Sequence, residues 1–237
     1  MKSALVTGAN SGIGFATVQL FLKNGYKVFA HYNSNKKNLE LIDNNNLSLL
    51  QADFKNTLET KKLFNNIIKE IPQIDVLVNN AGLYISVDDF DYLSTSIFDD
   101  TINVNLKAPF ILSKKYIKLM RKYNRGRIIN ISSIGVKYGG SPNSMPYTLS
   151  KSALETMTKS FAKEGAKYNI LVNALRVGVT DTDIHNSAKS KNMQNRIDMI
   201  PLKRMAEPKE IAEYILFLAS QKSNFTTGSI ITIAGGE

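Results

Sequence analysis

Short apolar runs alternate along the chain with longer stretches in which apolar residues recur every three to four positions. The short runs predict buried strands, and the longer stretches predict amphipathic helices that pack on them. Together they predict an α/β domain. Strands are expected at 4–6, 27–32, 47–52, 74–78, 126–133 and 170–175, and helices from about 12 and over 57–71, 93–123 and 147–167.

Two segments depart from this simple alternation. Pro109 lies inside the long helix predicted over 93–123, and because proline has no backbone N–H it should disrupt the hydrogen-bond ladder nearby. The stretch 134–146 is rich in glycine and is predicted to be a mobile loop.

A glycine-rich turn follows the first predicted strand. Gly8, Gly12 and Gly14 lie where that strand ends and a helix begins. The first amides of a helix lack intrahelical partners and the helix dipole favours negative charge, so this arrangement builds an anion site. The spacing G-x-x-x-G-x-G differs from the usual G-x-G-x-x-G dinucleotide fingerprint. A tight turn that only packs the helix on the strand therefore stays an alternative at this point.

The end of the second strand bears on which dinucleotide would bind. In dinucleotide folds an acidic residue here binds the adenosine ribose, whereas neutral or basic residues admit a 2′-phosphate. This chain has Tyr32 at that position, then Asn33 and Ser34, with no carboxylate before Glu40. We therefore predict NADP(H), with NAD(H) as the alternative. For Lys36 and Lys37, which follow, a generic polar turn is the alternative interpretation. After the third strand, Asp53 could receive the adenine amino group or cap the next helix.

The composition is that of one domain with an excess of positive charge. The chain has 237 residues, 30 Lys and Arg against 20 Asp and Glu, a net charge of +10 and no cysteine. Disulfides and cysteine-ligated metals are thus excluded, and His31 and His185 lack the spacing of a metal pair, so no metal site is expected. The lysines are scattered, which favours a solvated surface over a nucleic-acid site.

No segment has the features of a membrane anchor or a leader sequence. Apolar runs fall short of the roughly 20 residues that a membrane span needs, and the first strand starts almost at Met1. We expect a soluble protein of the cytoplasm.

Tyr147 and Lys151 are candidates for acid–base chemistry. Four residues apart on a helix, their side chains project from one face. A phenol has an unperturbed pKa of about 10, and a nearby ammonium together with an oxidised nicotinamide would lower the pKa of Tyr147. Tyr147 could then exchange a proton with a carbonyl oxygen, and Ser133, at the end of the fifth strand, could hydrogen-bond the same oxygen. A lone Y-x-x-x-K pattern also describes a surface tyrosine and lysine.

In order and context, the motifs resemble those of the short-chain dehydrogenase/reductase family over essentially the whole chain. Among its members, 3-oxoacyl-carrier-protein reductases are the most similar. The resemblance rests on T-G-x-x-x-G-x-G at 7–14, N-N-A-G at 79–82, Asn105, Ser133, Tyr147 and Lys151, and extends to 201–204, 208–212, 227–228 and 235–236.

The resemblance implies a fold and an assembly. The fold would be a single Rossmann-type doubly wound α/β domain over 1–237, with a parallel seven-stranded sheet in the order 3-2-1-4-5-6-7. A lid over the substrate would lie at about 183–205, and His185 within it is expected to be a plain surface residue. The assembly would be a homotetramer, with the helices of Asn105 and Tyr147 at one interface.

The resemblance also implies roles for individual residues. Tyr147 would be the acid–base group, Ser133 would bind the carbonyl oxygen, and Lys151 would hold the nicotinamide ribose. Asn105, at a helix break, would hold a water through its backbone and link Tyr147 to solvent. The dinucleotide would contact Gly8, Asn10, Ser11, Gly12, Ile13, Gly14, Asn33, Ser34, Asp53, Phe54, Asn80, Ala81, Gly82, Tyr147, Lys151, Gly178, Thr180 and Thr182.

The implied reaction is hydride transfer between NADPH and a ketone or secondary alcohol. A 3-oxoacyl thioester, on acyl carrier protein or coenzyme A, is the expected substrate. A sugar derivative or another small ketone is the alternative, and a non-catalytic dinucleotide sensor is an alternative of another class. The complete set of Asn105, Ser133, Tyr147 and Lys151 argues against a sensor, which need not keep all four.

One departure from the family pattern follows the sixth strand. The family usually has Pro-Gly where this chain has Arg176-Val177-Gly178. Losing the proline frees the backbone at Val177, and Arg176 places a cation near the site. Arg176 could contact an acidic substrate or pair with a carboxylate such as Asp181 or Asp183; we favour the structural pairing.

Overall fold

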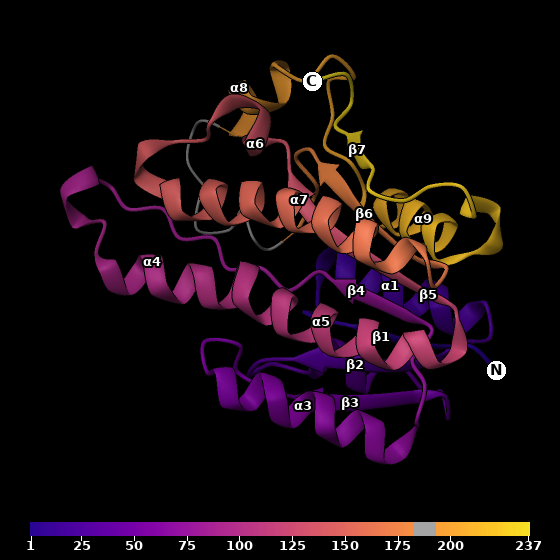
Figure 1. Ribbon diagram of the computed structural model, residues 1–237. Helices are drawn as coiled ribbons and strands as arrows, with labels where there is room; N and C mark the ends of the chain where they lie inside the picture. Colours follow the sequence, from indigo (N-terminus) through magenta and orange to yellow (C-terminus); the bar gives the residue numbers. More distant parts are fainter. Residues whose placement is uncertain (183–192) are drawn as a thin grey trace.

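Residues 1–182 and 193–237 are described by a computed structural model (Figure 1). In this part of the chain seven parallel strands form one sheet, in the order β3-β2-β1-β4-β5-β6-β7. The predicted fold class and strand order are therefore confirmed. The strands are β1 Ser3–Val6, β2 Lys27–Tyr32, β3 Leu47–Gln51, β4 Val76–Asn79, β5 Gly126–Ser133, β6 Ile170–Val177 and β7 Ile230–Ile233.

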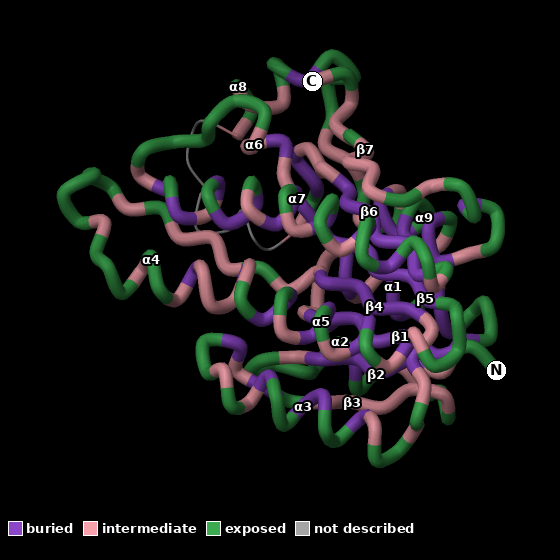
Figure 2. Tube along the Cα trace, in the orientation of Figure 1, coloured by how far each residue is buried: buried purple, intermediate pink, exposed green. Residues whose placement is uncertain are grey.

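Helices cover both faces of the sheet, as expected for parallel strands joined by helical crossovers. On one face α1 (Gly12–Lys23) and α9 (Pro208–Ala219) pack against one apolar cluster. On the other face α3 (Thr57–Glu70), α5 (Ala108–Met120) and α7 (Met145–Ala166) pack against a second. The inner strands of the sheet run through the buried centre of the molecule, the edge strands β3 and β7 are partly exposed, and the outer helix surfaces are exposed (Figure 2).

The remaining helices are short. They are α2 (Lys37–Glu40), α4 (Thr95–Ile102), α6 (Gly135–Tyr138) and α8 (Met193–Asp198), with 3₁₀ turns at Phe90–Tyr92, Arg121–Tyr123, Pro142–Ser144 and Gln221–Ser223. The stretch 134–146, predicted to be a loop, thus contains α6 and a 3₁₀ turn. None of the described helices is long and apolar enough to cross a membrane.

The long helix predicted over 93–123 is interrupted. A π-helical turn, Asn103–Lys107, separates α4 from α5, and the amide of Ala108 bonds back to the carbonyl of Asn103, five residues earlier. The disruption predicted near Pro109 is confirmed, and its form is one wide turn that leaves the helix continuous. Such π-turns are rare and frequently lie at functional sites.

The carboxyl ends of the strands meet at one edge of the sheet. The chain reverses direction in the sheet order between β1 and β4, because β2 and β3 lie on one side of β1 and the later strands on the other. In open α/β sheets ligands bind at such a switch point, beyond the carboxyl ends of the strands. The fold thus places the glycine-rich turn, which follows β1, at the expected position of a ligand site.

Candidate active site

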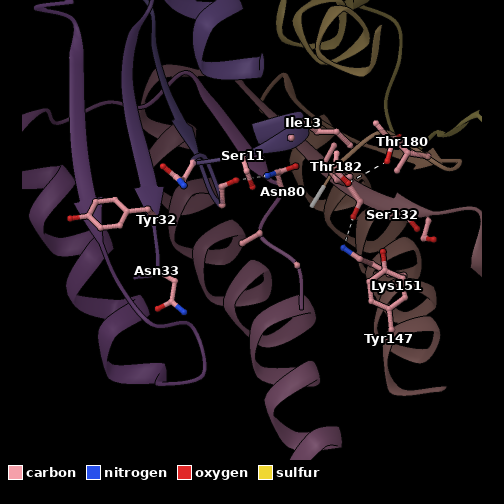
Figure 3. A pocket seen from close by; sticks show the side chains of 18 of the residues that line it. Ser11, Ile13, Tyr32, Asn33, Asn80, Ser132, Tyr147, Lys151, Thr180 and Thr182 are labelled. Carbon is pink, nitrogen blue, oxygen red and sulfur yellow. Dashed lines mark hydrogen bonds between the residues drawn. The ribbon is translucent and has the colours of Figure 1, made fainter. Parts of the chain in front are cut away.

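An open cavity of about 520 Å³ lies at this edge of the sheet (Figure 3). Tyr32 and Asn33 lie at one end of it and Tyr147 and Lys151 at the other. Most of the residues predicted to bind cofactor or substrate line it. They are Gly8, Asn10, Ser11, Gly12, Ile13, Asn33, Ser34, Asn80, Ala81, Gly82, Ser133, Tyr147, Lys151, Gly178, Thr180 and Thr182.

Other residues of the lining have no equally clear signal in the sequence. Asn38 belongs to a short helix on the far side of the glycine turn, and its side chain and backbone amide bond to the backbone oxygen and side chain of Asn10, at 2.9 and 3.2 Å. Only a motif that covered the whole strand–turn–helix unit could have indicated this contact. The residues that were not among the predicted contacts are Tyr32, Asn35, Asn38, Ile131, Ser132 and Val177.

The glycine turn is held close to the chain that follows β4. Gly8 has a φ of +63°, and a Cβ atom there would lie 2.7 Å from the Cα atom of Ala81. At Gly14 a Cβ atom would lie 2.3 Å from the carbonyl oxygen of Gly8. Gly14 therefore serves the packing of α1 against the turn and is not itself among the lining residues. Gly14 thus fits the tight-turn interpretation of the spacing, while Gly8 and Gly12 line the cavity.

Thr7 and Asn80 form the connection between these two segments. The hydroxyl oxygen of Thr7 accepts hydrogen bonds from the amides of Asn80 and Ala81, at 2.9 and 3.0 Å. The side-chain amide of Asn80 donates to the carbonyl oxygens of Thr7 and Gly8, at 2.8 and 3.0 Å. The N-N-A-G motif thus fixes the backbone of the glycine turn before any ligand binds.

The end of the cavity near β2 presents neutral polar groups. Tyr32, Asn33, Ser34 and Asn35 line it, and no Asp or Glu is among the described lining residues. Lys36 lies just outside and pairs with Glu40, with 2.8 Å between Nζ and Oε1. This end therefore has donors for an anionic group and no carboxylate that would repel one.

Two residues predicted to contact the cofactor lie elsewhere. Phe54 is 4 % exposed and stacks on the ring of His31, with 3.9 Å between ring centroids. Its apolar ring is part of the core under the cavity. Asp53 begins the turn into α3, where its Oδ1 accepts from the amide of Lys55 at 2.9 Å, while Asn56 caps the helix. Neither Asp53 nor Phe54 lines the cavity.

At the other end of the cavity Lys151 reaches the active-site candidates from α7. Its side chain is buried, and Nζ donates to the carbonyl oxygen of Ile131 at 2.8 Å. The same Nζ lies 5.6 Å from the centre of the Tyr147 ring. Ser133, at the end of β5, accepts a hydrogen bond from the amide of Gly135 at 3.2 Å. Tyr147, Lys151 and Ser133, which were predicted to act together, all line this cavity.

Burial shifts the pKa of both titrating groups. It raises the pKa of Tyr147 to about 12, and the Ser133 hydroxyl only partly offsets this. It lowers the pKa of Lys151 to about 8. The lowered pKa of Tyr147 is expected with an oxidised nicotinamide bound; in the protein alone burial of the phenol dominates and raises it. At neutral pH the pair is therefore a neutral phenol beside a largely protonated ammonium.

Asn105 lies within the π-helical turn and is fully buried. Its side chain accepts from the amide of Leu83 at 2.7 Å and donates to the carbonyl of Leu83 at 2.9 Å. It also donates to the hydroxyl of Ser150, which donates in turn to the carbonyl of Tyr147. The structure thus places Asn105 behind the cavity, where its side chain fastens the chain after β4 to the helix that carries Tyr147 and Lys151.

Beyond β6, Gly178 allows a close approach of the C-terminal strand. A Cβ atom there would lie 2.7 Å from the Cα atom of Ala234. Arg176, which lies in β6 two residues before Gly178, forms an ion pair with Glu155 of α7. The structural role favoured for Arg176 is confirmed, and the partner that the described residues show is Glu155 rather than Asp181. Asp183, His185 and the segment 183–192 of the predicted lid lie outside the described residues.

Comparisons with known proteins agree over nearly the whole chain. The family model described as "Enoyl-(Acyl carrier protein) reductase" matches residues 8–237. The 3-oxoacyl-[acyl-carrier-protein] reductase FabG of Rickettsia typhi is 38 % identical over 99 % of this chain and 96 % of its own length. The 3alpha-hydroxysteroid dehydrogenase of Mediterraneibacter gnavus is 34 % identical, again over 99 % of this chain and 96 % of the relative.

Solved structures also match this chain over nearly its whole length. A 4-hydroxyisoleucine dehydrogenase complexed with NADH superposes with a TM-score of 0.92 and 33 % identity, covering all of this chain and 98 % of the other. The protein ElxO with NADP bound has a TM-score of 0.88 and 32 % identity, covering 99 % and 98 %.

Proposed function

The chain belongs to the short-chain dehydrogenase/reductase family, and from this premise we propose that it reduces the ketone of a 3-oxoacyl thioester with NADPH. As a member of that family it is an NAD(P)-dependent oxidoreductase that acts on CH–OH groups. The observation that carries the proposal is the position of Tyr147, Lys151 and Ser133 in a cavity that also contains the glycine turn and ends at Tyr32 and Asn33.

The cavity fits a dinucleotide. The first amides of α1 face it beside Ser11 and Gly12, which suits a pyrophosphate. Gly12 has a φ of +52°, and a Cβ atom there would lie 2.7 Å from the Thr182 side chain, so a larger residue would close the cradle. NADPH is favoured over NADH because Tyr32, Asn33 and Ser34 line the adenosine end without a carboxylate. Relatives are solved with either cofactor.

The chain's own residues handle the substrate oxygen and its proton. When bound, NADPH supplies the hydride. Tyr147, whose raised pKa keeps the phenol protonated, donates its proton to the carbonyl oxygen as that oxygen gains charge. Ser133 donates a hydrogen bond to the same oxygen. The ammonium of Lys151 stabilises the phenolate that Tyr147 becomes. Asn105 holds α7, through Ser150, to the chain after β4 at Leu83.

The relatives support the proposed substrate class. Several curated relatives, at 34–38 % identity, are 3-oxoacyl-[acyl-carrier-protein] reductases, and a net charge of +10 suits an acidic carrier protein. The second candidate is a smaller ketone or secondary alcohol, because other relatives are named for a hydroxysteroid and for 4-hydroxyisoleucine.

We also propose a homotetramer with α4, α5 and α7 at one interface. Large apolar side chains are exposed on these helices, namely Phe98 at 41 %, Phe110 at 43 % and Leu149 at 47 %. Sedimentation analysis tests this: a monomer would contradict it.

The function is tested by following NADPH oxidation with acetoacetyl-coenzyme A, a diketone and a keto-sugar. Tyr147→Phe is expected to lower kcat by about 10²-fold or more while NADPH still binds. Tyr26→Phe, a tyrosine in the core away from the cavity, is the matched control. Turnover of acetoacetyl-coenzyme A that only Tyr147→Phe abolishes supports the proposal. Turnover of the smaller ketones alone supports the second candidate, and NADPH binding without any turnover favours the sensor.

A further inference from the structure

His31 joins three neighbouring segments under the adenosine end of the cavity. It lies in β2, which is paired with β1 on one side and β3 on the other. Its Nδ1 accepts from the amide of Gly8 at 3.1 Å, and its Nε2 lies 2.9 Å from the carbonyl oxygen of Ala52. Its own carbonyl oxygen accepts from the amide of Ala9 at 2.8 Å. One residue thus holds two consecutive amides of the glycine turn and the end of β3.

These contacts require a neutral imidazole of one tautomer. The amide of Gly8 can only donate, so Nδ1 must be the acceptor and Nε2 must carry the hydrogen that it donates to Ala52. Protonation of Nδ1 would place two donors against each other. The ring is 3 % exposed and stacks flat on Phe54, with 4° between the planes. The side chain therefore has little freedom to satisfy Gly8 and Ala52 in another way.

The segments that His31 joins carry the adenosine end of the site. Gly8 opens the glycine turn and lines the cavity, and the residues directly after His31, Tyr32 and Asn33, line it as well. Ala52 leads into the turn that begins α3, and its amide bonds to the carbonyl oxygen of Tyr32. A change in the position of the His31 side chain would therefore shift both the glycine turn and the residues after β2, which line the same end of the cavity.

We propose that His31 is a positioning residue for the dinucleotide. It holds the glycine turn and the end of β3 in register and thereby sets the affinity for the adenosine 2′-phosphate half of the cofactor. The inference rests on the proposed use of NADPH. An ordinary core residue could fill the same space, but among the described residues no other protein group bonds to the amide of Gly8 or the carbonyl of Ala52. A purely apolar side chain would leave both buried groups unpaired.

Two amide variants, each with a polar atom at the position of one ring nitrogen, separate the two hydrogen bonds. Asparagine has an acceptor at the position of Nδ1, so His31→Asn keeps the bond from Gly8 and loses the bond to Ala52. Glutamine has a donor at the position of Nε2, so His31→Gln keeps Ala52 and loses Gly8. We expect His31→Gln to weaken the binding of NADPH and of adenosine 2′,5′-diphosphate by the same factor, about tenfold. His31→Asn should weaken both by less, because the glycine turn stays anchored.

Tyr26→Leu is the matched control. Tyr26 directly precedes β2 at its other end and is as buried as His31, so its loss destabilises the same strand far from the cavity. Calorimetric titration should give it the Kd of the unaltered protein for both probes. Equal weakening in Tyr26→Leu and His31→Gln would make His31 an ordinary core residue, and an unchanged Kd in His31→Gln would also overturn the proposal. If the unaltered protein binds neither NADPH nor NADH, the proposed function itself fails, and this role with it.

A measurement on the unaltered protein covers the case in which His31→Gln does not fold. Nitrogen NMR should show His31 as the neutral Nε2–H tautomer, and the amide of Gly8 should exchange slowly with solvent before any cofactor is added. The other tautomer, or rapid exchange at Gly8, would contradict the proposal.

Discussion

Arg176 and Glu155 form a two-pronged ion pair between β6 and α7. Nε of Arg176 lies 2.9 Å from Oε1 and Nη2 lies 2.6 Å from Oε2. Ser132, the cross-strand partner of Arg176 in β5, donates its hydroxyl to Oε1 at 2.7 Å. A single buried carboxylate therefore joins two strands and a helix beside the cavity, one helical turn after Lys151.

Replacing Arg176 should destabilise the fold. Arg176→Met leaves Glu155, which is 7 % exposed, without its cation, and we expect the free energy of unfolding to fall by about 2 kcal/mol. Urea denaturation measures it. The double variant Arg176→Met with Glu155→Leu should recover most of the loss, because the unpaired charge is then gone. A single variant as stable as the unaltered protein would show that the pair contributes nothing.

The Arg176 pair illustrates what the sequence could not predict. The strands and the glycine turn follow from local sequence patterns and the strand order from the family resemblance, and these are confirmed. The partner of Arg176 lies 21 positions earlier, on a helix whose facing side depends on how it packs. Phe54 could not be placed for the same reason: whether an aromatic ring faces a cavity or turns under it depends on the neighbouring strand, here on His31.

Two other differences from the expectations have causes that a sequence pattern does not encode. The π-helical turn around Asn105 comes from one wide hydrogen bond, which leaves the apolar periodicity almost unchanged. The raised pKa of Tyr147 comes from burial by segments distant in the sequence. Motif order therefore predicted which residues gather, while their protonation and their exact neighbours needed the structure.

Reductase activity should fall above pH 8. Burial lowers the pKa of Lys151 to about 8, so the ammonium beside Tyr147 is mostly present at pH 7 and mostly lost at pH 9. In the proposed mechanism the charged form stabilises the phenolate, so kcat/KM for reduction should be level below pH 8 and decline above it. Lys151→Arg, which keeps its charge, should be slower but lack this decline. The same decline in both proteins would assign it to another group.

Replacement by alanine should weaken cofactor binding at Gly14 but not at Gly25. A Cβ atom at Gly14 would lie 2.3 Å from the carbonyl oxygen of Gly8, so Gly14→Ala must displace the glycine turn. We expect a loss of about 2 kcal/mol in stability and weaker NADPH binding. Gly25 has a φ of +74° but nothing within 4 Å of its Cβ position, so Gly25→Ala should cost about 1 kcal/mol and leave binding unchanged. Thermal unfolding and NADPH titration compare the two, and equal losses of affinity would contradict the packing role of Gly14.

Acid should destabilise the protein through His31. Burial lowers the pKa of His31 to about 4 from an ordinary 6.5, outweighing the bond to Ala52 and the charge of Asp53, which raise it. Between these two values the unfolded chain binds a proton that the folded chain does not, so the free energy of unfolding decreases as the pH falls from about 6.5 to about 4. A shift of this size corresponds to roughly 3 kcal/mol.

The variant His31→Asn isolates this contribution from the carboxylates that titrate in the same range. Asparagine does not titrate, so the difference in stability between the unaltered protein and His31→Asn should be constant above pH 6.5 and shrink below it. Urea denaturation at pH 7.5, 6.5, 5.5 and 4.5 follows the difference. A constant difference across this range would mean that His31 accepts its proton as easily in the folded protein as in the unfolded chain, and the hydrogen bond from Gly8 would then not require the neutral ring.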